Sequence, residues 1–304
     1  MSVPSICVLG SCNMDLVAYV GRYPRLGETV TGDRFTTVPG GKGANQAIAA
    51  ARAGGAVTMI GAVGRDAFGP QIRATLADSG VRLDLLREVD GPTGTAHITV
   101  DADGGNAIVV VPSANGTMRA LTAADERAIA AADVLVMQLE LPLEIVAAGA
   151  AAARSAGTRV ALTPAPVRPL PDTLMAGVDL LLANEHEAAQ LGLADGGAEP
   201  GDALAALLRR VPEAVVTLGA DGALYGGRDM PPVRTPAARV AAVDTTAAGD
   251  CFAGALVVAM AEGRPVRDAL RWATAASGLS VQRPGASSSM PGRAEIEAFA
   301  ATLR

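Results

Sequence analysis

The chain has 304 residues, of which 50% are hydrophobic and 18% are charged, and its net charge is −6. This length is sufficient for one large hydrophobic core with a small accessory piece. The mild acidity and the lack of a Lys/Arg cluster argue against a nucleic-acid partner. No run approaches the roughly 18 unbroken apolar residues of a membrane-spanning helix, so no membrane partner is expected.

The first residues and the cysteines bear on the cellular compartment. The stretch MSVPSICVLG lacks the basic region of a signal peptide and continues directly into an apolar strand pattern. Cys7, Cys12 and Cys251 are odd in number and do not have the spacing of a zinc site. We therefore expect a reducing, cytoplasmic setting.

Short apolar runs alternate with longer Ala-rich helical patterns along the chain. The runs that indicate buried strands span 5–10, 56–64, 133–140, 158–164, 178–185 and 213–219. The amphipathic stretches that indicate helices span 43–53, 66–79, 142–156 and 201–211. This alternation predicts an α/β fold of three layers, with a mostly parallel central sheet between two layers of helices.

Two segments interrupt the alternation. Residues 15–38 contain β-branched and aromatic side chains without a helical pattern. Residues 93–112 predict a hairpin around the turn DADGGN. We expect these segments to form a small sheet that stands off the main body.

Polar residues follow the first predicted strand, in GSCNMDL at 10–16. Asn13 and Asp15 are two residues apart, so on an extended segment they point to the same side. A carboxylate and an amide on one face can bind a vicinal diol. The alternative is ordinary Asn/Asp turn chemistry.

A glycine-rich stretch, VPGGKGANQAIAAARAG, opens the next helical pattern at 38–54. It places Lys42 among three glycines and Asn45 in the first helical turn. A nearly bare backbone with one Lys and one Asn suits a polar, hydroxyl-rich ligand, although a flexible turn with a surface Lys fits equally well. The stretch is not a Walker A loop, and no dinucleotide-binding G-x-G-x-x-G follows a strand.

Acidic and amide residues also stand at the ends of later predicted strands. Glu140 ends the strand in QLELP, where open α/β sheets bind their ligands. Asn184 and Glu187 in NEHEAAQL lie three apart on one helix face, which suits a hydrated cation and a phosphate. His186 stands without a second histidine nearby, so a surface position is the simpler interpretation than a zinc ligand. The Gly-rich turn in VVTLGADGALY, at 215–225, could lie along a nucleotide.

The stretch DTTAAGDCFAGAL, from residue 244, places an acid at the start of an apolar helical pattern. The first N–H groups of a helix have no intrahelical partner and carry partial positive charge. Residues 247–249 bear almost no side chain, so these N–H groups can form an anion hole. Asp250 beside them could be a base for a hydroxyl that attacks a phosphoryl group. The competing interpretation is a first-turn acid behind alanines that only pack.

Together these motifs resemble, in order, those of the ribokinase (PfkB-type) family of sugar and nucleoside kinases. The resemblance extends from residue 6 to about residue 291 and includes GAVGRDAFG between the motifs above. It implies a ribokinase-like α/β domain over residues 1–304 with an inserted β-sheet lid at 13–38 and 93–112. It also implies ATP-dependent phosphorylation of the ribose 5-hydroxyl, and a homodimer formed through the lid.

The resemblance further implies roles for individual residues. Asp250 would be the general base, and the anion hole would consist of Ala247, Ala248 and Gly249. The sugar would be held by Asn13, Asp15, Gly41, Lys42, Asn45, Glu140 and Asp250. The ATP side would be lined by Asn184, Thr217, Gly219, Gly222 and Gly249. Glu187 would bind Mg2+ through water, and an activating K+ would lie near Asp244, Thr246, Ser280, Arg283, Gly285 and Ser289.

Two positions depart from the family pattern, and several alternative functions stay open. Thr163 stands where Asn is usual, and Ser113 stands where Gly is usual. The alternatives are a kinase for another pentose, deoxyribose or a ribonucleoside, for which Tyr19, Tyr23 and Phe35 offer stacking rings. A non-catalytic sugar sensor would be expected to lack Asp250 or the anion hole, and the chain keeps both.

Overall fold

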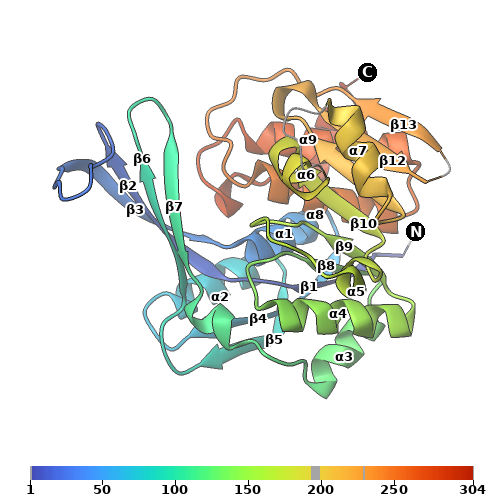
Figure 1. The fold of residues 1–304 in the computed structure, drawn as a ribbon, viewed down its shortest axis with the longest axis horizontal. Coiled ribbons are helices and arrows are strands. Elements are labelled where there is room, and N and C mark those ends of the chain that lie inside the picture. Colours follow the sequence, from blue (N-terminus) through green and yellow to red (C-terminus); the bar gives the residue numbers. More distant parts are fainter. Residues whose placement is uncertain (1, 193–198, 229, 304) are drawn as a thin grey trace.

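The structure is a computed structural model that describes residues 2–192, 199–228 and 230–303. Its main body contains a nine-stranded sheet in the order β13-β12-β11-β10-β9-β8-β1-β4-β5 (Figure 1). The pairs from β5 to β11 are parallel, and β12 and β13 add an antiparallel edge. The strands are β1 (Ser5–Leu9), β4 (Ala56–Gly64), β5 (Arg82–Val89), β8 (Val134–Met137), β9 (Arg159–Leu162), β10 (Leu180–Asn184), β11 (Glu213–Thr217), β12 (Ala223–Gly227) and β13 (Met230–Thr235).

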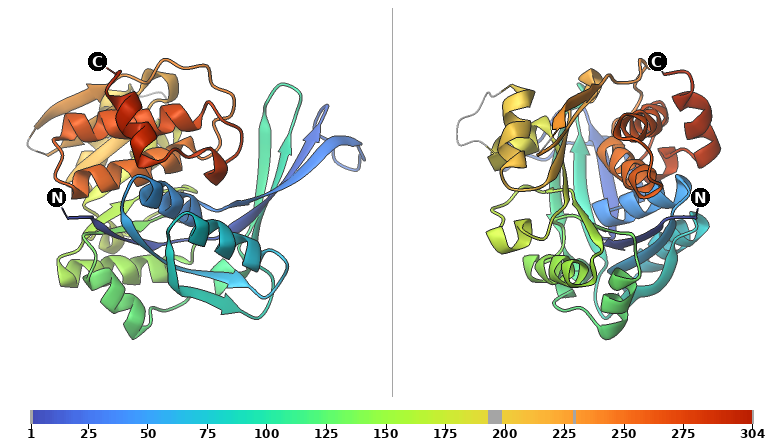
Figure 2. Two further views of the ribbon diagram at one scale, coloured as in Figure 1. Left: turned by 180° about the vertical axis from the view of Figure 1, so that it is seen from behind. Right: turned by 90° about the vertical axis from the view of Figure 1, so that its right-hand side faces the viewer.

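Helices cover both faces of this sheet, which confirms the predicted three-layer α/β fold (Figure 2). One face packs against α1 (Lys42–Arg52), α2 (Gly69–Asp78), α8 (Ala248–Ala261), α9 (Val266–Ser280) and α10 (Arg293–Ala300). The other packs against α3 (Ala123–Ala130), α4 (Leu143–Ala156), α5 (Asp172–Met175), α6 (Glu185–Gly192) and α7 (Pro200–Leu208). Among the described residues, no helix has both the length and the apolar character that crossing a membrane requires.

Strand β1 shows how the sequence divides the core between the two faces. Its apolar side chains alternate, so Ile6 and Val8 join the core on the α1 and α8 side, while Cys7 and Leu9 join the core on the α4 side. A continuous apolar run is therefore required in a strand that is covered on both faces. This is the pattern from which the buried strands were predicted.

A second sheet stands off the body in the order β3-β2-β6-β7 (Figure 1). Its strands are β2 (Asn13–Val20), β3 (Gly32–Gly40), β6 (Gly94–Val100) and β7 (Asn106–Val111). The expected hairpin is the antiparallel pair of β6 and β7. Strand β2 pairs with β6 in parallel and begins soon after β1 ends, so the chain passes directly from the large sheet into the small sheet.

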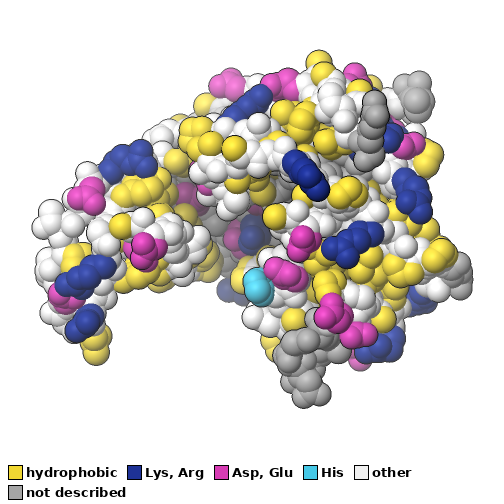
Figure 3. Space-filling view, turned by 90° about the horizontal axis from the view of Figure 1, so that it is seen from above, with side chains coloured by type: hydrophobic (Ala, Val, Ile, Leu, Met, Phe, Trp, Pro, Cys, Tyr) yellow, Lys and Arg dark blue, Asp and Glu magenta, His cyan; other side chains and the backbone are white. Residues whose placement is uncertain are grey.

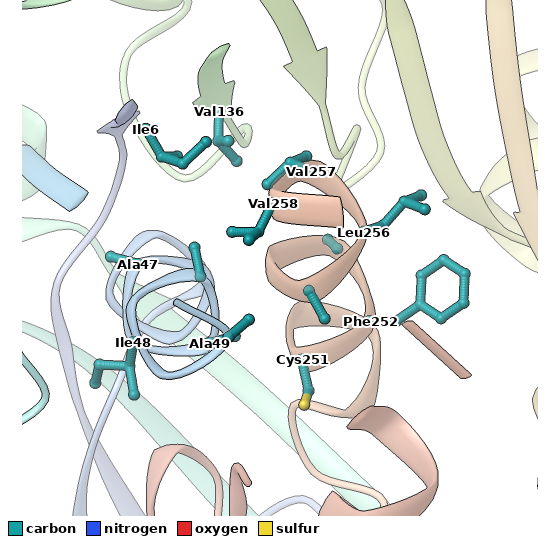
Figure 4. Close-up of a cluster of buried hydrophobic side chains, with 14 of the residues drawn as sticks. Ile6, Ala47, Ile48, Ala49, Val136, Cys251, Phe252, Leu256, Val257 and Val258 are labelled. Carbon is teal, nitrogen blue, oxygen red and sulfur yellow. The ribbon is translucent and has the colours of Figure 1, made fainter. Parts of the chain in front are cut away.

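Helices α1 and α8 pack very closely, and this contact sets the spacing of the site described below. A Cβ added to Gly254 of α8 would lie 2.6 Å from the Ala49 Cβ and 2.8 Å from the Ala50 backbone nitrogen of α1. Figure 4 shows Ala49 and Val258 turned toward the space between the two helices. Only glycine at position 254 permits this approach.

Candidate active site

The predicted site residues gather around a hollow between the small sheet and the body. Figure 3 shows this face hollowed, with acidic and basic side chains at the bottom of the hollow. The chain segments that meet there are the carboxyl ends of β1, β8 and β9 and the first turns of α1 and α8. Such a position, beyond the carboxyl ends of parallel strands, is where open α/β sheets bind ligands.

Asp250 lies in the first turn of α8 and is 6% exposed. Both of its carboxylate oxygens accept hydrogen bonds from α1. Asn45 donates from Nδ2 to Oδ2 at 3.2 Å, and Gln46 donates from Nε2 to Oδ1 at 2.9 Å. The Asn45 Oδ1 atom is buried without a partner among the described residues, so it remains available to a ligand hydroxyl.

The start of α8 presents backbone N–H groups beside this carboxylate. Ala247 has a left-handed backbone with φ +58°, and Ala248 donates its N–H to the Thr245 carbonyl at 3.2 Å. The N–H groups of Ala247 and Gly249 have no acceptor in the part of the chain that the structure describes. A Cβ added to Gly249 would meet nothing within 4 Å, so the approach to these N–H groups is open.

Glu140 joins the segments on the side of the small sheet. Its carboxylate accepts hydrogen bonds from the Ser11 hydroxyl, from the Lys42 backbone N–H at 3.0 Å and from Asn13 Nδ2 at 3.5 Å. Asn13 is 1% exposed, and its Oδ1 accepts from Asn115 Nδ2 at 2.8 Å. Asn115 also bonds both backbone polar groups of Cys12, so it fixes the turn between β1 and β2.

Lys42 is the only lysine in the sequence and lies half-buried at the start of α1. The nearby Asp250 carboxylate, followed by those of Glu140, Glu187 and Asp15, raises the pKa of its ammonium group against the effect of burial. Burial, and then the charges of Glu140 and Asp250, raise the pKa of the Asp15 carboxyl to about 7, while Lys42 lowers it. The site thus pairs one cation with a group of acids.

The glycines around Lys42 have a structural reason that the sequence interpretation did not include. Gly41 has φ +90°, and a Cβ there would lie 2.7 Å from the Asn13 backbone nitrogen. A Cβ on Gly40 would lie 2.3 Å from Asp15 Oδ2. These glycines allow the loop to press against β2, which leaves room for the Asp15 carboxylate.

The residues predicted for the ATP side lie at the carboxyl ends of β10 and β11. Asn184 and Glu187 cap each other: the Asn184 N–H donates to Glu187 Oε2 at 2.9 Å, and the Glu187 N–H donates to Asn184 Oδ1 at 2.8 Å. Thr217 ends β11, and the following turn has positive φ at Gly219 and Gly222. No contact of the described residues joins this group directly to Asp250, although the charge of Glu187 acts on Lys42.

The residues predicted for a monovalent cation form a neighbouring group before α8. The Asp244 carboxylate accepts from the Thr246 N–H at 2.9 Å and from the Gly285 N–H at 2.8 Å, so it ties the two loops together. The hydroxyls of Ser280 and Ser289 share a buried hydrogen bond of 2.8 Å. The Arg283 guanidinium is paired with Glu295, outside this group of residues.

Sequence interpretation missed Gln46, Gln138 and Asn115 as parts of the site. Each is a buried amide next to a residue or strand that was predicted. Gln46 directly follows Asn45, and Gln138 directly follows β8. Buried amides at the edge of a predicted ligand site are a usable signal, because a buried amide requires hydrogen-bond partners.

Comparisons with known proteins place similar sequences along nearly the whole chain. A family model described as the pfkB family of carbohydrate kinases matches residues 3–293. The chain is 42% identical to the ribokinase of Schizosaccharomyces pombe, with 96% of each chain covered. It is also 42% identical to that of Bacillus subtilis, with 96% of this chain and 98% of the relative covered. The solved Arabidopsis thaliana ribokinase complexed with ribose and ATP superposes with a TM-score of 0.92 at 34% identity, covering 98% of this chain and 99% of that one.

Proposed function

Because the chain belongs to the pfkB family of carbohydrate kinases, we propose that it transfers the γ-phosphoryl group of ATP to the 5-hydroxyl of D-ribose. One observation carries the proposal: Asp250 is buried at the hollow, held at both oxygens by α1, beside backbone N–H groups that have open space in front of them. A base and an anion site this close together suit an alcohol that attacks a phosphoryl group.

In the proposed reaction Asp250 accepts the proton of the attacking hydroxyl. The N–H groups of residues 247–249 at the start of α8 receive the negative charge of the transferred group, aided by the helix dipole. The Lys42 ammonium adds positive charge among the acids. Closure of the small sheet as a lid over the sugar would exclude water and suppress transfer to water.

The sugar side of the proposal uses the acceptors that face the hollow. The Asp15 carboxylate and the unpartnered Asn45 Oδ1 accept from sugar hydroxyls, and Lys42 donates. Glu140 and Asn13 are already bonded to neighbouring segments, so they serve chiefly to hold β1, β2 and α1 at the correct spacing. Gly41 contributes the close approach of the loop to β2.

ATP, Mg2+ and K+ fit the remaining residues. Asn184, Thr217, Gly219 and Gly222 would line the nucleotide. Glu187 has one carboxylate oxygen beyond its bond to Asn184, which fits a magnesium ion that is held mainly by phosphates and water. Asp244 would supply negative charge near a bound K+, with Thr246, Ser280, Arg283, Gly285 and Ser289 in the neighbouring loops. Mg2+ would neutralise phosphate charge.

A homodimer through the small sheet is also proposed. Strand β7 exposes Val109 by 65% and Ile108 by 52%, and Val110 and Val111 by 42% each. Phe35 on β3 is 62% exposed. A second copy of this chain would cover this apolar surface.

The three buried free cysteines are compatible with the predicted cytoplasmic setting.

The deciding experiment is release of ADP from ATP with Mg2+ and K+ across D-ribose, 2-deoxyribose, other pentoses and ribonucleosides. A saturable preference for D-ribose supports the proposal, and a rate that falls when Na+ replaces K+ supports the cation site. A preference for a nucleoside would assign the chain to a different acceptor within the same family. Sugar binding without any turnover would favour a sensor.

A further inference from the structure

A chain of buried hydrogen bonds leads from the ends of β8 and β9 to Asp250. Gln138 follows β8, Thr163 follows β9, and Gln46 lies in the second turn of α1. Gln46 Oε1 accepts from Gln138 Nε2 at 2.6 Å, and Gln46 Nε2 donates to Asp250 Oδ1 at 2.9 Å and to Thr163 Oγ1 at 3.2 Å. Gln46 is 0% exposed and Gln138 is 1% exposed, so the bonds of Gln46 to Gln138 and to Asp250 are buried away from water, while the bond to the half-buried Thr163 is at the margin.

These contacts allow the Gln46 amide only one orientation. Both of its N–H groups donate and its oxygen accepts, so its hydrogen-bonding groups are all used. Turned by half a rotation, its oxygen would face the Asp250 carboxylate, and this repulsive contact is costly in a buried setting. Its oxygen would also lose the donor of Gln138, unless the Gln138 amide turned with it.

We propose that Gln46 is the positioning residue for the Asp250 carboxylate, and that Gln138 and Thr163 hold the Gln46 amide in place. The proposal rests on the proposed role of Asp250 as base. Asn45 holds one carboxylate oxygen and Gln46 holds the other, so the plane of the carboxylate is defined relative to the hollow. Displacement of a reacting group by about 1 Å can lower a rate by about 100-fold, so this control of position matters for turnover.

The proposal gives Thr163 a function at the position where the family usually has Asn. Its hydroxyl accepts the second N–H of Gln46, which would otherwise be a buried donor without a partner. Thr163 directly follows β9, and its backbone N–H donates to the Met137 carbonyl at 2.9 Å. This bond fixes the backbone position from which the Thr163 side chain extends. Thr163 therefore acts on the base through Gln46.

The first test is the pH profile of kcat in Gln46→Glu. The new carboxylate would lie against Asp250 and disfavour its ionisation, so the acid limb of the profile should move to higher pH by about one unit or more. The other charged groups near Asp250, Lys42 and Asp15, are unchanged in this variant. We expect kcat at neutral pH to fall at least about 10-fold while KM for both substrates changes by less than about 3-fold.

The control is Gln71→Glu, the same substitution at an exposed position on α2. It should leave the profile at the wild-type position. A Gln46→Glu profile that is lowered equally at every pH, without movement of its acid limb, would overturn the proposal, because a purely structural defect predicts that result.

A second test measures the contact without turnover. Urea unfolding of wild type, Gln46→Glu, Asp250→Asn and the double variant forms a cycle. Gln46→Glu should lose stability as pH rises from 5 to 8, because both facing carboxylates then ionise and repel each other. Asp250→Asn should reduce that loss to the part that burial of the new carboxylate causes by itself. Equal loss in both backgrounds would refute the contact. If wild type fails to phosphorylate ribose, the proposed function falls while this cycle still decides the inference.

A third test uses the matched pair Thr163→Val and Thr163→Ser. Valine keeps the shape and removes the hydroxyl acceptor, whereas serine keeps the hydroxyl and removes the methyl group. We expect kcat to fall about 10-fold in the valine variant, with serine restoring most of it. The reverse order would show that Thr163 acts by packing alone.

Discussion

Asp250 is a buried acid that two amide donors hold beside open backbone N–H groups. Replacement of Asp250 by Asn keeps the shape but removes the proton acceptor. We expect kcat to fall by about 10²–10⁴-fold while ribose still binds, as measured by steady-state turnover and by calorimetry. Turnover within about 10-fold of wild type would contradict the role of base.

Asp15 makes a separate prediction about pH. Its carboxyl has a pKa raised to about 7, chiefly by burial, so the free protein loses much of the ionised form in mild acid. In the proposed role of Asp15 the ionised form accepts from sugar hydroxyls, so kcat/KM for ribose should fall as pH drops below about 7. Asp15→Asn should weaken ribose binding and flatten the dependence of kcat/KM on pH. If kcat/KM of that variant still falls with the wild-type slope, the titration belongs to another group.

The same raised pKa has an opposite effect on folding. Because the folded pKa exceeds the unfolded value of about 3.9, the contribution of Asp15 to stability is largest in acid and is lost as pH rises to about 7. If ribose binds the ionised form, as the proposed role of Asp15 requires, the increase in Tm on adding ribose should be larger at pH 8 than at pH 6. Equal increases would contradict this linkage.

The backbone conformation at Ser113 favours the glycine that is usual at this position. Its φ is +45°, in the left-handed region that costs a side chain about 1–2 kcal/mol. Part of that cost is offset because glycine loses more freedom on folding. Ser113→Gly should therefore raise the unfolding free energy by about 0.5–1 kcal/mol in urea titration, with kcat nearly unchanged. A loss of stability would contradict the strain.

At the scale of elements, the contact of α1 with α8 controls the distance from Asp250 to its amide donors. Gly254→Ala would force these helices apart, because the added Cβ lies 2.6 Å from the Ala49 Cβ. We expect a loss of about 1–3 kcal/mol and a lower kcat, from urea unfolding and turnover. Gly201→Ala on α7 is the control, since a Cβ there meets nothing within 4 Å. Equal effects of the two substitutions would contradict the close contact.

The elements that could be predicted are those buried on both faces. Strands β1, β4 and β11 carry continuous apolar runs, and the sequence sufficed to place them. Strand β5 is mostly half-exposed and β13 contains two prolines, so neither has a clear strand pattern.

The residues of the site divide in a similar way between those that the sequence predicted and those that it did not. Asp250 and Lys42 stand in recognisable motifs, whereas Gln46 and Asn115 act through partners that are distant in sequence and become visible only in three dimensions.

At the scale of the whole molecule, the small sheet presents an apolar outer strand that a folded monomer would leave to solvent. Val109→Lys should convert the proposed dimer into a monomer, as measured by light scattering across a concentration series. Gln71→Lys, at an exposed position on α2, is the control. A wild-type protein that is already monomeric at micromolar concentration would contradict the dimer.

Lys42 gives the molecule a chemical property that follows from its composition. Every other basic side chain apart from the histidines is an arginine, so the only lysine amine of the chain lies at the hollow. An amine-selective reagent, such as an acylating dye, can therefore modify just one lysine, and that position is adjacent to Asp250. Protection of this amine by an added sugar would report occupancy directly by mass spectrometry, without ATP and without catalysis.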